Sequence, residues 1–449
     1  MKHILVLGAG KSTSYLISYL LRNAIEHDWF ITVGDRRLDL ARKSIEGHQR
    51  GQAIQLDIND ASTRATLIAK SAVVINMLTR PYQHLVALEC LNQGVHMVTA
   101  SYEDPKVRAL DSEAHRKNVL ILNEMGFDPG IDHMLGMSVI NRLRKRGGVV
   151  SSFRSYGGGL PAPNSTLNPF RYGITWNPRN VLMAGEDGAV YKEDGHIRLL
   201  PFHHLFERTW TVDVDGVGTL EAYPNRDSLA YEAVLGLKAN HTIVRGTLRY
   251  PGWSETWQQI VYLGLANEVL AIPNLQEMTY QQLTAMCLPQ DPRPGRIDQQ
   301  VANYLGISPT GKIMENLKWL GLFSDKQIGF EASTAADAMI HLIQDKLRMP
   351  EDALDIAILV MEIECVYPNE QGRKEQARLT LVVQGRPGDH TAIAKTVGLP
   401  VAIGVKLLLT NRLPLTGCHI PIHPAVYEPV VEGMKEEGLE WTEEVRPAG

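Results

Sequence analysis

The stretch Lys2–Leu16, KHILVLGAGKSTSYL, decides which kind of phosphate-binding fold this chain opens with. Its segment Gly8–Thr13, GAGKST, ends like a P-loop, whose pattern is Gly, four residues, then Gly-Lys-Ser/Thr. Counting back from Gly10, the position of the first P-loop glycine holds Leu5, inside an apolar run. A leucine within a strand cannot start the loop that wraps a phosphate, so the P-loop interpretation fails.

The same stretch matches the strand–turn–helix order of a dinucleotide-binding fold. A buried strand is expected over residues 3–7, a turn at Gly8 and Gly10, and a helix from about Ser14, with pyrophosphate at the helix N-terminus. The third glycine of the fingerprint is replaced by Thr13, so the turn alone is weak evidence. The rest of the chain has to decide.

Composition narrows the class of protein. The 449 residues suffice for two or three domains, and 44% apolar with 21% charged residues is typical of globular proteins. The formal charge of −5 and the absence of basic blocks give no reason to expect nucleic acid as a partner. No signal peptide and no membrane helix is expected, because no apolar run approaches the necessary length. The widely spaced Cys90, Cys287, Cys365 and Cys418 indicate reduced thiols, so we expect a cytoplasmic protein without a membrane partner.

The first third of the chain alternates short apolar runs with helical segments. The runs do not alternate with polar residues, as expected of strands buried on both faces of a parallel sheet. They are ILVL, WFITVGD, AIQLDIN, AVVINML, HMVTA and VLILNE. We therefore predict an α/β fold with a Rossmann-type doubly wound parallel sheet, whose ligand crevice lies at the carboxyl ends of the strands.

After Glu124 the pattern changes to loop-rich segments, and from about Pro251 to Leu347 it becomes helical. The runs ALDIAILVMEIECVY and EQARLTLVVQG flank the polar stretch PNEQGRK and predict an antiparallel hairpin. Residues 391–409 predict a buried helical stretch broken at Gly398-Leu399-Pro400.

Eight motifs in order carry a family resemblance. They are TASYEDP, FDPGIDH, SYGGGLPAP, NPFRYGITW, YPNRDS, RGTLRY, WLGLFSD and KTVGLPVAI, spread from residue 99 to residue 403. In them the chain resembles the glutamate-forming saccharopine dehydrogenases, also called saccharopine reductases.

The resemblance implies three domains and a homodimer. The expected parts are a Rossmann domain, a mixed α/β substrate-binding and dimerisation domain, and a small helical domain. Their predicted bounds are 1–124 rejoined by 391–449 for the first, 125–255 with 348–390 for the second, and 256–347 for the third.

The resemblance also implies a reaction of lysine metabolism. Saccharopine, oxidised nicotinamide dinucleotide and water give L-glutamate and 2-aminoadipate 6-semialdehyde, reversibly. Hydride leaves the carbon beside a secondary amine, an imine forms, water adds, and the adduct collapses to an aldehyde and an amine. Such a site needs a bound nicotinamide, groups that move protons, and cationic partners for three carboxylates.

Asp128, in FDPGIDH, is the first candidate for proton transfer, with Tyr102 as the second. By resemblance both contact the substrate, as does Ser101, which follows the fifth predicted strand. The alternative for Asp128 is an N-cap of the helix expected near Pro129. Asp132 and His133 resemble an acid–base pair, but a lone histidine entering a helix is usually structural, so neither is assigned a role.

The substrate carboxylates are assigned to Arg226 in YPNRDS and Arg249 in RGTLRY, because the guanidinium fork suits a carboxylate. Thr247 and Leu248 beside Arg249 complete the predicted substrate site, and Arg245 is a weaker third cation. A surface position is the ordinary alternative for any arginine.

The dinucleotide is assigned to residues at the ends of the predicted strands. Asp35, 25 residues after Gly10, lies where a carboxylate binds the adenosine ribose hydroxyls, while Arg36 suits a 2′-phosphate. We predict NAD as the preferred cofactor and NADP as the second. The full predicted set is Gly8, Gly10, Lys11, Ser12, Asp35, Arg36, Arg37, Asp57, Ile58, Asn76, Thr99, Ala100 and, closing over the nicotinamide or simply in the core, Trp176.

One departure from the family stands out, and no metal site is expected. Gly157 in SYGGGLPAP replaces the cysteine usual in the family, so proton transfer must not depend on a thiol there. Two histidine-containing clusters match no zinc pattern. They are His203, His204 and Glu207, and Cys418, His419 and His423.

Two other functions stay open at this point. One is a polyamine-type imine reductase of the same wider family, of the carboxynorspermidine or homospermidine type. The paired arginines argue against it, since a polycation prefers acidic partners. The other is a non-catalytic dinucleotide-binding redox sensor, which the presence of Asp128 and both arginines disfavours.

Overall fold

The structure is a computed structural model of the chain, and it describes residues 1–165, 168–237, 241–289, 295–350, 352–388 and 390–448. The chain divides into two compact units, which are described one after the other. The first consists of Met1–Val150 and Leu354–Gly449, and the second of Ser151–Ala353. The three-domain boundaries given above stay predictions.

The first unit contains a seven-stranded sheet in the order β16-β6-β5-β4-β1-β2-β3, with all neighbours parallel. Its strands are β1 (Lys2–Leu7), β2 (Trp29–Asp35), β3 (Gly51–Gln55), β4 (Val73–Asn76), β5 (His96–Val98), β6 (Leu120–Leu122) and β16 (Gly417–His419). The six strands predicted in the first third are confirmed. The strand β16 joins them from the C-terminal part of the chain.

Helices alternate with these strands, as a doubly wound sheet requires. They are α1 (Ser14–Asn23), α2 (Leu38–Ile45), α3 (Ala61–Ala69), α4 (Gln83–Gln93), α5 (Pro105–Arg108) and α6 (Asp111–Arg116). Local signals set their ends: Asp60 caps α3 by accepting from Ser62 and Thr63 N–H, and Gly94 ends α4 at φ +68°. Apolar residues of α4 and the strands fill one core, with Leu5, Val74 and Leu91 at most 1% exposed.

The long helix α14 (Ala392–Leu409) runs without interruption through Pro400, so the predicted break there is wrong. The proline removes one backbone N–H, but the helix is nearly all buried and packs on α1 and α15 (Pro424–Glu436), and this packing outweighs the local cost. Gly398 allows the close approach to α1, since a Cβ there would lie 2.9 Å from the Leu16 nitrogen.

This helix also corrects the expectation that no segment approaches membrane-spanning length. It has the length and apolarity to cross a membrane, but 83% of its 18-residue window is buried inside the protein, as in a core helix.

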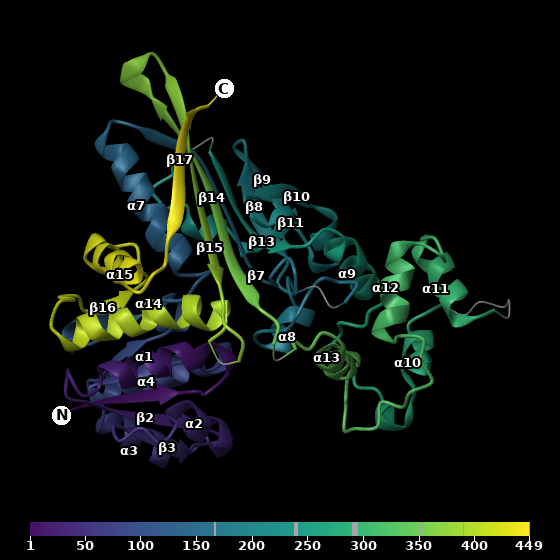
Figure 1. Cartoon of the computed structure of the whole chain (residues 1–449), viewed down its shortest axis with the longest axis horizontal. Helices are drawn as coiled ribbons and strands as arrows, with labels where there is room; N and C mark the ends of the chain where they lie inside the picture. Colours follow the sequence, from purple (N-terminus) through teal and green to yellow (C-terminus); the bar gives the residue numbers. More distant parts are fainter. Residues whose placement is uncertain (166–167, 238–240, 290–294, 351, 389, 449) are drawn as a thin grey trace. The chain divides into compact units, whose positions relative to one another are not determined.

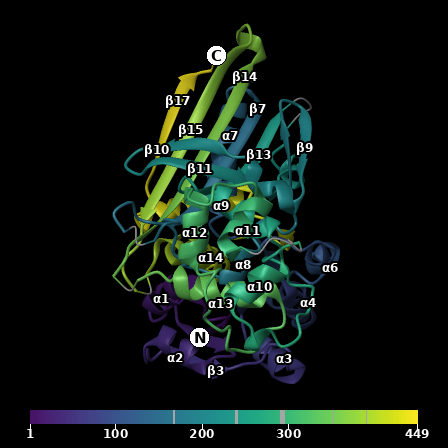
Figure 2. The same ribbon diagram turned by 90° about the vertical axis from the view of Figure 1, so that its right-hand side faces the viewer.

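The rest of the first unit is an antiparallel group of strands covered by helices. The predicted hairpin is confirmed as β14 (Asp355–Tyr367) and β15 (Arg373–Gln384), and β17 (Trp441–Pro447) pairs with β15. Figures 1 and 2 show these three strands side by side. Helix α7 (Ile131–Lys145) packs on β14 and on α15.

The second unit is a mixed sheet followed by helices. Four strands lie in the order β10-β11-β13-β7, with β13 parallel to β7 and antiparallel to β11, and β12, β8 and β9 extend it. The strands are β7 (Val149–Pro161), β8 (Ala189–Glu193), β9 (His196–Leu200), β10 (Trp210–Val214), β11 (Gly218–Pro224), β12 (Arg226–Asp227) and β13 (Thr242–Arg249).

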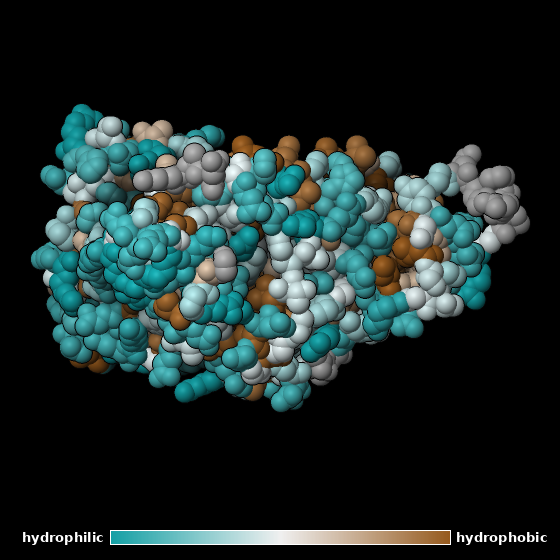
Figure 3. All heavy atoms as spheres, turned by 90° about the horizontal axis from the view of Figure 1, so that it is seen from above, coloured by the Kyte–Doolittle hydropathy of each residue, from teal (hydrophilic) through white to brown (hydrophobic). Residues whose placement is uncertain are grey.

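The helical periodicity predicted for residues 251–347 is confirmed. The helices of this unit are α8 (Pro178–Leu182), α9 (Trp253–Tyr262), α10 (Tyr280–Met286), α11 (Ile297–Leu305), α12 (Lys312–Leu320) and α13 (Ala335–Lys346). Hydrophilic residues make up most of the surface drawn in Figure 3, and apolar residues form separate patches on it.

Candidate functional site

The turn after β1 has the backbone shape of a phosphate-binding loop. Gly8 adopts φ +99°, and a Cβ there would lie 3.3 Å from the Met77 carbonyl oxygen. Gly10 is exposed and has no atom within 4 Å of the position of a Cβ. A short 3₁₀ turn, Lys11–Thr13, then leads into α1, as predicted. The open space at Gly10 and the helix start that follows it fit a dinucleotide pyrophosphate.

The end of β2 is tied to this turn through Asp35. Its Oδ2 accepts from the Ala9 N–H at 2.7 Å and its Oδ1 accepts from the Arg37 N–H at 2.8 Å. Asp35 is half-buried, whereas Arg36 and Arg37 are exposed, and Arg37 lies 3.4 Å from Asp39. The carboxylate therefore lies at the carboxyl edge of the sheet, next to the glycine turn, where a ribose is bound in Rossmann folds.

Two further predicted cofactor residues follow β3. Asp57 is exposed and accepts from the Asn59 N–H at 2.9 Å, while Ile58 is 8% exposed and belongs to the core. The Ile58 side chain therefore packs in the hydrophobic core.

Polar side chains join the ends of β4 and β5. The Asn76 amide donates to Gln83 Oε1 at 3.1 Å, and Gln83 Nε2 donates to Ser101 Oγ at 3.0 Å. Thr99 is buried, and its hydroxyl accepts from the Ser101 N–H at 3.1 Å. Gln83, which sequence reasoning missed, thereby links two predicted residues, Asn76 and Ser101, and Thr99 joins them through Ser101. Its only sequence signal is a glutamine at the start of the helix that follows the fourth strand.

Asp128 lies in a turn that brings the chain back on itself between β6 and α7. The Gly126 N–H donates to the Pro129 carbonyl at 3.0 Å, and a Cβ at Gly130 would lie 2.1 Å from the Gly126 carbonyl oxygen. Ala100 packs against the same turn, 3.1 Å from the position of a Gly126 Cβ. The helix α7 begins at Ile131 with Gly130 as its N-cap, so the alternative of Asp128 as the N-cap is wrong. Asp128 is half-buried.

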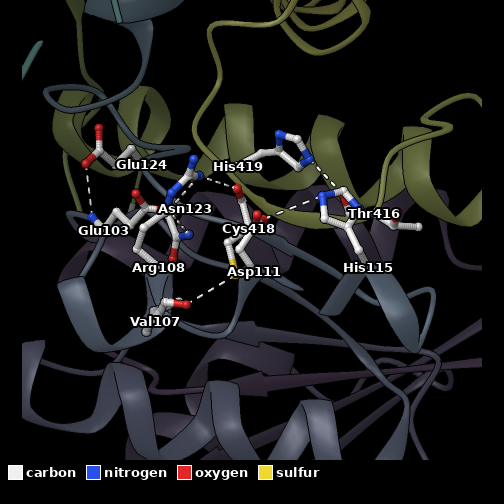
Figure 4. Close-up of polar contacts among 10 residues, drawn as sticks. All are labelled: Glu103, Val107, Arg108, Asp111, His115, Asn123, Glu124, Thr416, Cys418 and His419. Carbon is white, nitrogen blue, oxygen red and sulfur yellow. Dashed lines mark hydrogen bonds and ion pairs between the residues drawn. The ribbon is translucent and has the colours of Figure 1, made fainter. Parts of the chain in front are cut away.

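Beside this turn lies a group of ionisable side chains, of which Glu124 is buried, Glu103 half-buried and Arg108 exposed. The Tyr102 loop continues into Glu103, whose Oε1 accepts from the Asn123 amide at 3.2 Å and lies 3.9 Å from Arg108 (Figure 4). Burial raises the pKa of Glu103 to about 7; the Arg108 charge lowers this pKa, and the Glu124 charge raises it further. Glu124 accepts from the Glu103 N–H at 3.0 Å. A carboxyl group that changes charge near neutral pH therefore lies next to the loop of Tyr102.

In the second unit, Arg249 is enclosed by aromatic rings. It is 3% exposed, and its guanidinium carbon lies 4.8, 5.6 and 5.3 Å from the ring centres of Tyr172, Tyr223 and Trp253. Its Nη1 donates to the Leu248 carbonyl at 2.7 Å, and its Nε is without a hydrogen-bond partner among the described residues. The indole N–H of Trp176 donates to Tyr172 Oη at 3.1 Å, so Trp176 reaches the rim of this aromatic group.

The other predicted substrate residues of this unit are placed differently. Arg226 adopts φ +53° on β12 and pairs with Asp187 at 2.7 Å, so its guanidinium is held by a neighbouring carboxylate. Leu248 is fully buried, and Thr247 pairs in register with Gly157 across β13 and β7. The residue that replaces the usual cysteine is thus the direct neighbour of a predicted substrate residue.

The two histidine clusters are held by ordinary polar contacts. His204 lies 3.0 Å from Glu207, and His419 Nε2 lies 2.7 Å from the Thr416 carbonyl oxygen. Across the described part of the chain, no group of three or more His, Cys, Asp or Glu side chains could hold a metal ion.

Two family models together match most of the chain. The NADP binding domain of saccharopine dehydrogenase matches residues 4–122, and the saccharopine dehydrogenase C-terminal domain matches residues 126–439. The first match includes the glycine turn and Asp35, and the second includes Asp128, Arg226 and Arg249.

Full-length relatives agree with these models. The NADP(+), L-glutamate-forming saccharopine dehydrogenase of Pyricularia oryzae is 31% identical over 99% of both chains. The mitochondrial alpha-aminoadipic semialdehyde synthase of Bos taurus is 33% identical over 98% of this chain, which spans 47%, about half, of that longer protein.

A solved structure shows the same architecture. The apo L-Glu-forming saccharopine dehydrogenase of Saccharomyces cerevisiae has a TM-score of 0.87 and 28% identity, covering 99% of this chain and 100% of that one. The chain belongs to the saccharopine dehydrogenase family.

Proposed function

We propose that this protein oxidises saccharopine, with a nicotinamide dinucleotide and water, to L-glutamate and 2-aminoadipate 6-semialdehyde, and that it also runs in reverse. Support comes from the name of the Pyricularia oryzae relative, which matches over the full length of both chains. Within the chain, the observation that carries the proposal is the buried, ring-enclosed Arg249.

Arg249 fits a substrate that bears carboxylates. A buried charge is costly unless it is paired, and aromatic faces supply only part of that compensation. With one guanidinium nitrogen lacking a hydrogen-bond partner, Arg249 is suited to bind an incoming carboxylate. A polyamine would bring a second positive charge to this position, which argues against the polyamine-type alternative. Arg226 is the second proposed carboxylate ligand, exchanging Asp187 for the substrate.

The proton transfers are assigned to the half-buried residues of the first unit. Asp128 takes the proton of the secondary amine and later helps the leaving amine, and Tyr102 assists at the water that adds to the imine. Ser101, held by Gln83, binds the substrate. Because Gly157 supplies no thiol, Asp128 and Tyr102 carry these steps.

The nicotinamide dinucleotide, when bound, takes up the hydride from the carbon beside the amine. In this proposal Gly8 and Gly10 hold its pyrophosphate at the start of α1 and Asp35 accepts hydrogen bonds from ribose hydroxyls, which the open position at Gly10 and the bond of Asp35 to the glycine turn support. The family model describes an NADP binding domain, and the named fungal relatives use NADP(+). We nevertheless propose NAD as the better cofactor of this chain, because Asp35 would repel a 2′-phosphate by like charge.

The experiment is an absorbance assay for reduced nicotinamide with the purified protein. Saccharopine is compared with secondary-amine polyamines, each with NAD and with NADP. Reduction of the dinucleotide with saccharopine, and not with the polyamines, supports the proposal. Reduction with polyamines would favour the polyamine-type enzyme, and dinucleotide binding without turnover of any amine would favour the redox sensor.

A further inference from the structure

A buried ionic cluster, formed by Glu124, Asp132 and His133, lies next to the turn that contains Asp128. Their side chains are 5%, 1% and 2% exposed. His133 Nε2 lies 2.8 Å from Glu124 Oε2, and His133 Nδ1 lies 3.4 Å from Asp132 Oδ2. The function proposed above uses none of these three residues.

The two carboxylate neighbours favour the charged form of the histidine. Ionised carboxylates only accept hydrogen bonds, whereas a neutral imidazole has one nitrogen that must accept. With a carboxylate oxygen beside each ring nitrogen, the doubly protonated imidazolium is the form that satisfies both sides. It also places one positive charge between two buried negative ones.

The cluster joins the two loops that carry the proposed catalytic residues. On one side, Asp132 Oδ1 accepts from the Gly130 N–H at 2.6 Å, which holds the turn of Asp128. On the other side, Glu124 Oε1 accepts from the Glu103 N–H at 3.0 Å, and the Glu124 N–H donates to the Ser101 carbonyl at 3.0 Å. These bonds hold the loop of Ser101 and Tyr102.

The backbone at Glu124 supports a specific role for this contact. Glu124 adopts φ +58°, in the left-handed region that non-glycine residues rarely occupy. Such a conformation persists only where its surroundings fix it, and it turns the carboxylate toward His133.

We propose that His133 is a positioning residue, whose imidazolium links Glu124 to Asp132 and thereby fixes the turn of Asp128 relative to the loop of Ser101 and Tyr102. The proposal rests on the function proposed above, in which those loops carry the proton transfers.

The charges around the cluster determine what its loss does. Glu103, whose N–H donates to Glu124, lies near Arg108. Arg108 Nη1 donates to the Cys418 carbonyl at 2.6 Å (Figure 4). Asp111 lies in the same region and accepts from the Cys418 N–H. Without His133, the Glu124 carboxylate loses the ring nitrogen that lies 2.8 Å from it, while the charge of Glu103 still acts on it.

The test compares His133→Gln, Glu124→Gln and the double variant with the unmodified protein. His133→Gln should lower kcat for saccharopine by roughly tenfold to a hundredfold at pH 8, as expected for misplaced reacting groups. The dinucleotide affinity should stay within about twofold, since the glycine turn is unchanged. KM for saccharopine should change less than kcat, since the substrate arginines are unchanged and only the contact with Ser101 is disturbed.

The pH profile separates positioning from a general structural defect. In His133→Gln, the Glu124 carboxylate no longer has an imidazolium beside it, and protonation removes its unpaired charge. The loss of kcat relative to the unmodified protein should therefore shrink as the pH is lowered toward 6. The double variant has no carboxylate at position 124, so it should regain part of the activity. The ratio of its kcat to that of the unmodified protein should no longer depend on pH. The matched control is His115→Gln on α6, an exposed histidine, which should change nothing.

Hydrogen exchange gives a readout that needs no substrate. Peptides covering residues 99–104 and 126–132 should exchange faster in His133→Gln at pH 8 and return toward the unmodified rate at pH 6. Unchanged exchange and kcat, or an equal loss at every pH that the double variant does not relieve, would overturn the proposal. If the unmodified protein fails to oxidise saccharopine, the proposed function fails, while the exchange data still decide whether His133 fixes both loops.

Discussion

The carboxylate of Asp35 accepts a hydrogen bond from the backbone N–H of Ala9 at 2.7 Å, which ties the end of β2 to the glycine turn after β1. A single side chain thus holds the glycine turn and is also the residue proposed to meet the adenosine ribose. Substitutions at Asp35 therefore have to separate an effect on the turn from an effect on cofactor choice.

The first prediction concerns the cofactor. Asp35→Asn keeps an oxygen that can accept the Ala9 N–H but removes the charge, so the ratio of kcat/KM for NADP over NAD should rise by about tenfold or more, equivalent to about 1.4 kcal/mol. Asp35→Ala should shift the ratio in the same direction with a lower activity for NAD. An unmodified protein that already favours NADP would mean that Asp35 does not face the ribose.

The second prediction concerns the buried guanidinium of Arg249. Arg249→Ala should lower kcat/KM for saccharopine by roughly thirtyfold or more, because removing one partner of a buried charge pair costs about 2–5 kcal/mol. Arg249→Lys keeps the charge but loses the planar fork, so it should recover only part of the loss. Arg226→Ala should also weaken saccharopine binding.

Two checks accompany this prediction. Arg198→Ala on β9 removes an exposed arginine of the same unit and should leave the kinetics unchanged. Dinucleotide affinity, measured by fluorescence titration, should barely move in any of these variants. Unmodified kinetics in Arg249→Ala would refute the carboxylate assignment.

The third prediction concerns Asp128. Asp128→Asn preserves size but removes the ionisable group, so kcat should fall by at least about 10²-fold and the pH profile should flatten. Asp60→Asn, at the exposed N-cap of α3, is the control and should leave kcat unchanged. A loss confined to KM would show instead that Asp128 orients saccharopine and that water or the substrate amine moves the proton.

The fourth prediction concerns stability against pH. Glu103 has its pKa raised to about 7 from an ordinary value of 4.5, mainly by burial, so the folded state holds its proton over a range in which the unfolded chain has lost it. The contribution of this carboxyl to stability is complete below about pH 4.5 and is lost as the pH rises to about 7.

Urea unfolding across this range checks the sign. As the pH rises across this range, the free energy of unfolding of the unmodified protein should fall relative to that of Glu103→Gln, by about 2–3 kcal/mol as an upper estimate. Glu113→Gln, at a more exposed carboxyl on α6, should show no such slope. A constant difference between the unmodified protein and Glu103→Gln across the range would contradict the raised pKa.

The fifth prediction concerns the contact between α14 and α1. Gly398→Ala places a methyl group 2.9 Å from the Leu16 backbone nitrogen and should destabilise the protein by about 1–3 kcal/mol. Gly404→Ala, in the same helix, is the matched control, because its methyl group would meet mainly the flexible end of Met125. Equal thermal stability of the two variants would mean that the helices adjust at Leu16.

Much of this protein was determined by local sequence. The six strands of the first third and the turn at Gly8 follow from short-range patterns, because burial on both faces of a sheet and a positive φ leave direct marks on residue type. The hairpin of β14 and β15 was predictable because two apolar runs flank a polar stretch that suits a turn. The sequence motifs around Asp128 and Arg249 supply the candidate site residues, whose roles stay predictions.

Only the tertiary structure decided the rest. Pro400 is locally unfavourable to a helix, yet α14 continues through it because its burial stabilises the helix more than one lost hydrogen bond costs. The rings around Arg249 come from separate segments of the chain, at Tyr172, Tyr223 and Trp253. The pairing of His133 with Glu124 depends on the turn between β6 and α7, which brings the two side chains into contact. Two ionisable side chains influence each other's charge strongly only when folding places them in contact in a buried environment.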